Sequence, residues 1–475
     1  MNKTYSVPAI YQTLQARKAA TGFQVPIQVS VPGSKSITNR ALLLATLANG
    51  RSTLRGVLFS EDSRHFLKCI QDLGFETTVD EEAKIISVEG HGGAVPRAEA
   101  DQFVGSAGTA ARFLTAYLGI SHGTYHVDAS EQMRKRPMAP LLDSLKELGC
   151  EVIYADSGNS PGERHSPGEG HLPFTLKGHG FQKDRISINI DASSQFLSAL
   201  LIASCLSEQD FTTYIEGTHG RAYIDMTVKM MEQFGVQAAP LYYCNGNSEN
   251  HSCTGCINST LPMGYRTASG QTYRPLDYQI EPDVSAACYF YAMSPLLGIP
   301  VQVNHVHYNS LQGDVAFIRI LEEMGCRVTD QENGILVEPP ADGIFHGITA
   351  DLSACSDQAI TLAAIAPYAD SPTSITGIGH IRFQESDRIT AIVTELRKMG
   401  IRCEETESSI TIWPGQPKAA LIETYDDHRM AMGFSLTGLR SAGIVIDNPG
   451  CCKKTFDEYF DVLDQVVREL MPCTS

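Results

Sequence analysis

Five segments of the chain repeat one pattern of apolar and polar positions. In each, apolar residues recur at the three- and four-residue spacing of one helical face, and a bulky apolar residue closes the run. A glycine follows, where the residue after a helix often adopts the left-handed conformation, and then a short stretch of alternating or β-branched residues. The pattern predicts five copies of helix, turn and strand, with the turns at Gly74, Gly149, Gly235, Gly325 and Gly400.

These glycines lie 75 to 90 residues apart. Solenoid repeats are shorter, about 20–50 residues. The spacing therefore favours copies of a compact α/β unit, and the apolar pattern of residues 456–470 predicts a helix that closes a sixth copy. The alternative is that helix, glycine and strand is merely a common local pattern. Five occurrences at comparable intervals favour the structural repeat.

Two stretches lack this periodicity. Residues 155–170 are rich in glycine, serine and proline and are predicted to be a loop. Residues 243–274 form a long polar insertion. Its candidate metal ligands are Cys244, His251, Cys253 and Cys256. Only one Cys-x-x-Cys pair is present, so an unstructured surface loop is favoured over a zinc site.

Composition narrows the class of protein. A chain of 475 residues, 43% of them hydrophobic, is long enough for two domains with their own cores. The net charge of −17 argues against nonspecific nucleic-acid binding and makes any local cluster of Lys and Arg informative. Thirteen scattered cysteines without an apolar leader predict reduced thiols in the cytoplasm. No apolar run reaches the roughly 18–20 residues of a membrane span.

The most concentrated candidate chemistry lies in residues 31–40, Val-Pro-Gly-Ser-Lys-Ser-Ile-Thr-Asn-Arg, directly before an apolar run. Unpaired backbone N–H groups at a helix N-terminus favour anions. Lys35 adds a point charge, and Arg40 adds a planar fork suited to a carboxylate. Gly33 and Lys35 are too close for a P-loop. The segment therefore predicts a site for a small anion.

Further candidate motifs precede other predicted helices, and each has two interpretations. The cations at 134–136 form either a solvated face or an anion site. The residues at 193–195 suit phosphate oxygens or a helix cap. Asp357 is a helix cap or a general base, and Glu385 and Arg388 have the spacing of a simple helical ion pair. No catalytic triad, dinucleotide fingerprint or complete metal-ligand set is present.

Together these motifs resemble the 3-phosphoshikimate 1-carboxyvinyltransferase (EPSP synthase) family. They occur in the family's order and span about residues 22–465. The resemblance is carried by residues 32–45, 105–113, 134–141, 193–201, 223–228, 281–290, 356–363, 384–392, 424–436 and 451–463.

The resemblance implies an α/β fold of two domains, a two-domain inside-out α/β barrel. Each domain would hold three βαβαββ repeats, with the active site in the interdomain cleft. Residues 1–32 plus 280–475 would form a discontinuous domain I, and residues 33–279 domain II, which carries the polar insertion. The family's domains close when the acceptor binds. A monomer without metal or other cofactor is expected.

The family reaction transfers the enolpyruvyl group of phosphoenolpyruvate to the 5-hydroxyl of shikimate 3-phosphate and releases phosphate, in chorismate and aromatic amino acid biosynthesis. Carried over by motif, the phosphoenolpyruvate ligands would be Lys35, Gly108, Arg136, Gln195, Arg388, Arg429 and Lys454. The acceptor would be held by Lys35, Ser36, Arg40, Ser193, Ser194, Gln195, Asp357, His380 and Gln384. Asp357 would take the hydroxyl proton, and Glu385 with Lys35 would protonate the methylene carbon.

Five positions depart from the family pattern: Ser106, Phe113, Gly220, His380 and Gln384 stand where Asn, Pro, Ser, Asn and Lys are common. The last three would contact the phosphoshikimate side. They motivate a rival hypothesis, an enolpyruvyl transferase of the same fold with a modified acceptor.

Two further hypotheses agree less well with the residues. The sister family that uses UDP-N-acetylglucosamine has a reactive cysteine after its first anion site, and no cysteine lies between Cys69 and Cys150. A non-catalytic paralogue would have lost Lys35, Asp357 or Glu385, and all three are present.

Overall fold

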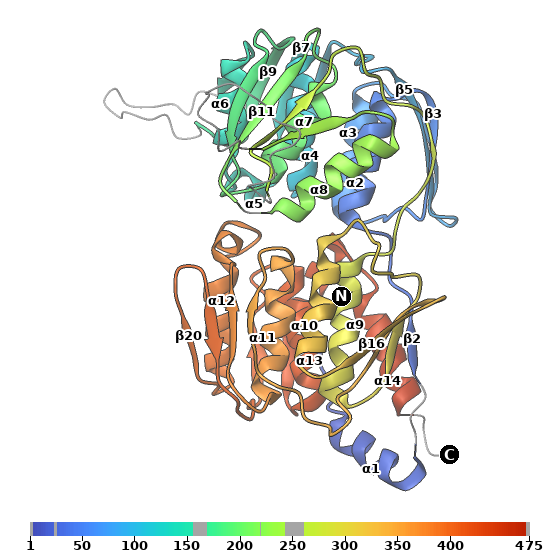
Figure 1. The fold of residues 1–475 in the computed structure, drawn as a ribbon, viewed down its shortest axis with the longest axis vertical. Helices are drawn as coiled ribbons and strands as arrows, with labels where there is room; N and C mark the ends of the chain where they lie inside the picture. Colours follow the sequence, from blue (N-terminus) through green and yellow to red (C-terminus); the bar gives the residue numbers. More distant parts are fainter. Residues whose placement is uncertain (1–2, 23–25, 155–168, 219, 243–260, 472–475) are drawn as a thin grey trace. The chain divides into compact units, whose positions relative to one another are not determined.

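The computed structural model describes residues 3–22, 26–154, 169–218, 220–242 and 261–471. The candidate zinc ligands Cys244, His251, Cys253 and Cys256 lie outside these residues, as do residues 155–168 of the predicted loop. The chain divides into two compact units. Unit 1 comprises Met1–Ser34 and Glu281–Ser475, and unit 2 comprises Lys35–Ile280. Within each unit, sheets lie outside a group of helices (Figure 1).

Unit 2 contains three four-stranded sheets of one topology. In each, the first two strands are parallel and the remaining pairs antiparallel, which is the βαβαββ arrangement. The first sheet has the order β14 (Asp277–Gln279), β3 (Asn49–Arg55), β5 (Ile85–His91), β4 (Thr77–Asp80). The second has β6 (Glu99–Phe103), β7 (His122–Asp128), β9 (Phe174–His179), β8 (Glu151–Tyr154). The third has β10 (Arg185–Asn189), β11 (Phe211–Glu216), β13 (Gly264–Thr267), β12 (Ala238–Leu241).

Two kinds of helix fill unit 2. The first kind is buried almost all round, as in α4, where all 13 residues are buried. Its members are α2 (Lys35–Leu47), α4 (Gly108–Ile120) and α7 (Gln195–Ser204). The second kind is amphipathic and buries one face. Its members are α3 (Glu61–Asp72), α6 (Ala139–Glu147) and α8 (Arg221–Gln233), and a short α5 (Glu131–Arg134) precedes α6. A helix that is apolar on every side must lie inside the core, which explains the inside-out arrangement.

Unit 1 repeats this plan with one variation. Its first sheet has the order β16 (Arg327–Gln331), β17 (Gly334–Glu338), β15 (Val301–Val303), β2 (Ile27–Val29). The second has β18 (Thr349–Asp351), β19 (Thr373–Thr376), β21 (Ile410–Ile412), β20 (Cys403–Glu405). The third has only three strands among the described residues, β1 (Thr4–Ser6), β23 (Ile444–Asp447), β22 (Ala420–Ile422). The sixth copy therefore obtains its antiparallel strand from the N-terminal segment rather than from a local hairpin.

The helices of unit 1 again fall into buried and amphipathic kinds. The buried ones are α9 (Val284–Leu297), α11 (Ala359–Ile365) and α13 (His428–Arg440). The amphipathic ones are α10 (Ala316–Glu323), α12 (Arg388–Lys398) and α14 (Tyr459–Leu470), and α1 (Tyr11–Thr21) precedes the first sheet in the chain. Short 3₁₀ turns are η1 (Gly313–Val315), η2 (Ser356–Gln358), η3 (Ala366–Tyr368), η4 (Gly379–Phe383) and η5 (Pro449–Lys454).

The repeat prediction is confirmed at its turns. All five glycines follow an amphipathic helix and have positive φ between 80° and 105°. The helix predicted at 456–470 is α14. The nine cysteines among the described residues are buried free thiols. No helix in the described part of the chain is long and apolar enough to cross a membrane.

The interpretation of residues 243–274 as a loop throughout was wrong. Gly264–Thr267 forms β13, which pairs with both β11 and β12 inside the third sheet of unit 2. Tyr273 is also buried, and its hydroxyl donates to the Ile202 carbonyl at 3.0 Å. A four-residue strand carries too little alternation to stand out from a polar sequence, so its place was decided by its neighbours.

Candidate functional site

Most of the predicted site residues of unit 1 lie at the starts of its helices. Asp357 lies in η2 before α11, and Arg388 is the first residue of α12. Asp427 caps α13, because its side chain accepts a hydrogen bond from the backbone N–H of Arg429 at 3.0 Å. Lys454 ends η5. The carboxylate–cation cluster is the name we give to Asp357, Glu385, Arg388, Asp427, Arg429 and Lys454.

Arg388 is the centre of this cluster. Its guanidinium is 1% exposed and contacts three carboxylates. Nη1 donates to Asp357 at 2.9 Å, Nη2 to Glu385 at 2.8 Å, and Nε to Asp427 at 2.8 Å. Burial lowers the pKa of Arg388, but these carboxylates outweigh burial and raise it above its ordinary value. Arg388 therefore stays charged and orients all three acids.

Asp357 is held from two sides. One carboxylate oxygen accepts from Arg388, and the other accepts from Arg429 Nη2 at 2.7 Å. Its side chain is still 13% exposed. In the same way, Glu385 lies between Arg388 and Lys454, whose Nζ is 3.3 Å away. The two open interpretations are thereby resolved in part: Asp357 makes no helix cap, and Glu385 and Arg388 do pair.

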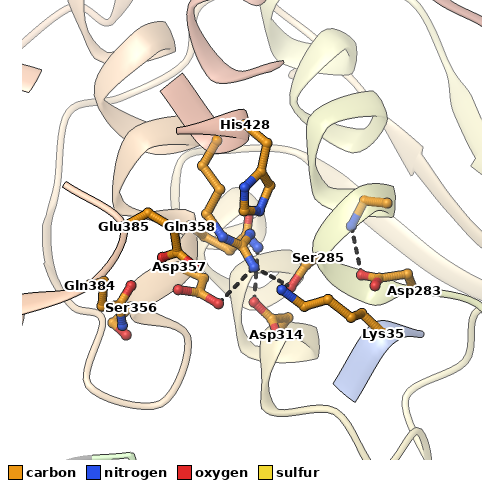
Figure 2. A network of polar contacts seen from close by, with 12 residues as sticks. Lys35, Asp283, Ser285, Asp314, Ser356, Asp357, Gln358, Gln384, Glu385 and His428 are labelled. Carbon is orange, nitrogen blue, oxygen red and sulfur yellow. Dashed lines mark hydrogen bonds and ion pairs between the residues drawn. The ribbon is translucent and has the colours of Figure 1, made fainter. Parts of the chain in front are cut away.

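His380 and Gln384, two of the departures from the family pattern, lie beside this cluster. His380 Nε2 is 2.8 Å from the Ser356 hydroxyl, next to Asp357 in the chain. The amide oxygen of Gln384 accepts a hydrogen bond from Arg388. Figure 2 shows Gln384, Glu385 and Asp357 close together. A neutral amide at 384 thus adds a fourth acceptor for Arg388 without adding charge.

Asp314 is a buried acid beside this cluster that the sequence motifs did not reveal. It lies in η1, its side chain is buried, and its Oδ1 accepts from Gln358 Nε2 at 2.8 Å. Burial, followed by the negative charge of Asp357, raises the pKa of Asp314 to about 6. The Gln-Gly-Asp sequence before an amphipathic helix could have indicated it, but only as a helix cap.

The raised pKa of Asp314 makes the stability of unit 1 depend on pH. The unfolded carboxyl ionises near pH 3.8 and the folded one near 6. The folded state favours the protonated carboxyl. The contribution of Asp314 to the unfolding free energy is therefore full below about pH 4 and is lost as the pH rises through about 6. We expect the unfolding free energy of Asp314→Asn, relative to wild type, to rise by about 2–3 kcal/mol between pH 4 and pH 7.5.

Urea unfolding followed by the fluorescence of Trp413 measures this difference. Trp413 is the only tryptophan of the chain and lies in unit 1 with Asp314. Because variant and wild type are compared at each pH, the titration of groups that do not interact with Asp314 cancels. A difference that stays constant from pH 4 to pH 7.5 contradicts the prediction.

In unit 2, Arg40 is buried within α2 and has uncharged partners. Its Nε donates to Thr227 Oγ1 at 2.8 Å, and its two terminal nitrogens donate to the carbonyls of Ser36 and Tyr223. Its guanidinium also lies 5.2 Å from the ring centroid of Phe113. Burial lowers the pKa of Arg40 to about 10, so it remains protonated at neutral pH.

Arg112 connects three of the predicted motifs of unit 2. Nη1 donates to the amide oxygen of Gln195 at 2.6 Å, and Nη2 donates to the Pro137 carbonyl at 3.4 Å. A Cβ added at Gly108 would come within 3.0 Å of both Arg112 and Arg136. In the sequence Arg112 stands inside a family motif but has no role of its own there. Its contacts orient the Gln195 amide and bring Arg136 to the start of α4.

The three cations at 134–136 separate in the structure. Arg134 pairs with Asp128 at 2.7 Å and Lys135 with Glu131 at 3.1 Å, both at the surface. Only Arg136 lies against Gly108. The solvated-face interpretation is thus right for two of them.

The remaining predicted residues of unit 2 lie at helix starts. Ser193 Oγ accepts from the Gln195 backbone N–H at 3.3 Å, and the buried Ser194 makes no cap hydrogen bond. Ser36 lies in the first turn of α2. Lys35 Nζ is 3.4 Å from the buried carboxylate of Asp62. Ser106 Oγ lies 2.7 Å from Ser130 Oγ, before α4.

Comparison with known proteins relates nearly the whole chain to one family. A family model described as EPSP synthase (3-phosphoshikimate 1-carboxyvinyltransferase) matches residues 21–259 and 262–463. A relative from Trichormus variabilis named 3-phosphoshikimate 1-carboxyvinyltransferase is 41% identical over 96% of this chain and 97% of its own. A relative of the same name from Nostoc sp. is also 41% identical, over 96% of this chain and 98% of its own. A solved EPSP synthase structure from Acinetobacter baumannii superimposes with a TM-score of 0.72, at 23% identity, over 93% of this chain and 96% of its own, which shows the fold.

Proposed function

The chain belongs to the EPSP synthase (3-phosphoshikimate 1-carboxyvinyltransferase) family, and from this premise we propose how its residues transfer an enolpyruvyl group from phosphoenolpyruvate to the 5-hydroxyl of shikimate 3-phosphate. The observation that carries the proposal is the carboxylate–cation cluster. It holds two carboxylates, Asp357 and Glu385, on either side of one buried guanidinium. Addition across a double bond needs one base and one acid, and this cluster offers both.

In the proposed first step, Asp357 accepts the proton of the 5-hydroxyl as its oxygen attacks C2 of phosphoenolpyruvate. Glu385, assisted by Lys35, donates a proton to C3, which becomes a methyl group. In the second step Glu385 takes a proton back from that methyl group and the double bond re-forms. The bond from C2 to the phosphate oxygen breaks as Asp357 returns its proton to the leaving phosphate. Phosphate is released, so atoms and charges balance over the two steps. Positioning and fixed positive charge supply the rate enhancement.

The proposed phosphoenolpyruvate ligands are the residues that match the family's motifs. In unit 1 these are Arg388, Arg429 and Lys454, each already next to a carboxylate. In unit 2 the proposed ligands are Lys35, Gly108, Arg136 and Gln195. The close approach of Arg136 to Gly108 supports this assignment, because an anion at the start of α4 meets backbone N–H groups and a guanidinium together.

Shikimate 3-phosphate would be held by Ser36 and Arg40 at its carboxylate and by Ser193, Ser194 and Gln195 at its phosphate. Lys35, Asp357, His380 and Gln384 complete the proposed set. Arg40 supports the carboxylate assignment, because its hydrogen-bond partners named above are neutral and a ligand anion would compensate its charge.

Acceptor-dependent release of phosphate tests the proposal. We expect the purified protein in metal-free buffer to release phosphate from phosphoenolpyruvate only when shikimate 3-phosphate is present. Substitution Asp330→Asn, on strand β16 outside the cluster, is the control and should leave the rate unchanged. Binding of phosphoenolpyruvate without any release of phosphate would overturn the assignment of shikimate 3-phosphate as the acceptor and favour a modified acceptor.

The proposal also concerns Gly220, which stands where serine is common in the family. Gly220 has a φ of 65°, and a Cβ there would lie 2.5 Å from Ser194 Oγ. Restoring serine is therefore expected to destabilise unit 2 by about 1–2 kcal/mol through the backbone, to displace Ser194, and to raise KM for shikimate 3-phosphate about threefold or more.

Gly270→Ser is the matched control, because Gly270 has a φ of 76° in unit 2 and no atom within 4 Å of an added Cβ. Calorimetric unfolding should show a similar backbone cost for both variants, and only Gly220→Ser should change KM. A lower KM in Gly220→Ser would show that serine is accommodated and refute this account.

We also infer a cytoplasmic monomer. The buried free thiols among the described residues fit a reducing compartment. Light scattering after size exclusion should give a mass near 51.7 kDa, and twice that mass would overturn the monomer.

A further inference from the structure

Asp314 is linked to Asp357 through one buried amide. Gln358 Nε2 donates to Asp314 Oδ1 at 2.8 Å, and Gln358 Oε1 accepts from Thr361 Oγ1 at 2.9 Å. Both ends of the amide are therefore used, and its orientation is fixed. Gln358 directly follows Asp357 in η2, and Figure 2 shows the three side chains as neighbours. The bond from Asp314 thus fixes the turn that presents Asp357.

Several titratable groups face Asp314. Asp357 and Cys355 approach from the η2 segment, Arg429 from α13, and Cys288 and the cap residue Asp283 from α9. Burial raises the pKa of both thiols far above neutrality, so they carry no charge. Arg429 donates to Asp357 at 2.7 Å, and its positive charge also lowers the pKa of Asp314. Two acids therefore share the field of one guanidinium, and charge on Asp314 makes Asp357 more basic.

We propose that Asp314 is a positioning residue for Asp357: its hydrogen bond through Gln358 fixes the turn, and its negative charge strengthens Asp357 as a base. The inference rests on the base role of Asp357 in the proposed function. It gives the enzyme an internal dependence on pH, because Asp314 is neutral in acid and charged at physiological pH.

The pH dependence of kcat in Asp314→Asn tests this. Asparagine keeps an acceptor for Gln358 but cannot ionise. The ratio of wild-type to variant kcat should be near one at pH 5 and rise to about three- to tenfold at pH 8. Groups that do not interact with Asp314 titrate alike in both proteins and cancel in the ratio, whereas a changed basicity of Asp357 is the effect that the ratio measures. A ratio that does not change with pH overturns the proposal.

Gln358→Met gives a second test that leaves Asp314 in place. The hydrogen bond from Gln358 lowers the pKa of Asp314, so its loss should move the acid limb of the kcat profile to higher pH. An unmoved limb overturns the proposal. Asp370→Asn is the control, because Asp370 pairs with His346 elsewhere in unit 1, and its ratio should be flat.

Asp357→Asn separates this inference from the proposed function. If that variant loses turnover and the Asp314→Asn ratio is flat, only the role of Asp314 is wrong. If Asp357→Asn keeps wild-type turnover, the proposed base is wrong, and the role of Asp314 falls with it.

Discussion

Replacing Asp357 with asparagine is expected to lower kcat by about 10²–10⁴-fold while phosphoenolpyruvate binds as tightly as in the wild type, or more tightly. The amide cannot accept the hydroxyl proton. At the same time, the substitution removes the negative charge that pairs with Arg388 and Arg429. Their nitrogens lie 2.9 and 2.7 Å from the Asp357 oxygens. Both guanidinium groups then have more positive potential to offer the ligand's phosphate.

Stopped-flow or quenched-flow turnover gives kcat, and calorimetric titration in the presence of shikimate 3-phosphate gives the dissociation constant of phosphoenolpyruvate. Asp330→Asn again serves as the control for a carboxylate outside the cluster. A kcat within threefold of wild type would remove Asp357 from the base role. A large loss of binding together with kcat would make it a ligand rather than a base.

Substitution of Arg388 by methionine is expected to damage both stability and activity. Methionine fills the space of the buried side chain but removes the guanidinium that pairs with the fully buried Asp427. The Ser386 hydroxyl and the Arg429 backbone N–H still donate to that carboxylate. Breaking a buried ion pair in this way costs about 3–5 kcal/mol. Loss of a guanidinium proposed to bind phosphoenolpyruvate should lower kcat/KM by about 10²–10⁴-fold.

The double variant Arg388→Met/Asp427→Asn distinguishes the two effects. Removing the unpaired charge of Asp427 should restore about half or more of the lost unfolding free energy, measured by urea unfolding and Trp413 fluorescence. The kcat/KM should stay low. Arg327→Ala, at an exposed arginine of β16, is the control and should cost less than about 0.5 kcal/mol. If the double variant is no more stable than Arg388→Met, the buried charge is not the cause.

The helix starts that bear the site could be predicted because their signals are local. Apolar spacing located the amphipathic helices, and the five glycines marked their ends. The motifs at Lys35, Gly108, Gln195 and Arg388 each begin a helix in the structure, as expected. The family, too, was indicated by the order of short motifs along the chain, and the comparisons confirm it.

Apart from the local pair of Glu385 and Arg388, the pairing of charges in the cluster could not be predicted, because the partners are distant in sequence. Arg388 is 31 residues from Asp357 and 39 from Asp427. Their contacts exist only because η2, α12 and α13 bring their N-termini together. Asp314 was not predicted for the same reason, because its partner Gln358 is 44 residues away.

The sequence by itself determined the repeated α/β units, the helix starts and the family, since periodicity, glycine turns and motif order are properties of neighbouring residues. The tertiary structure decided which cations face carboxylates, which lie at the surface, and which distant strands complete the first and last sheets. These outcomes depend on burial. A charge withdrawn from water must find a partner wherever the fold supplies one, and a short strand forms where a sheet edge is open to it.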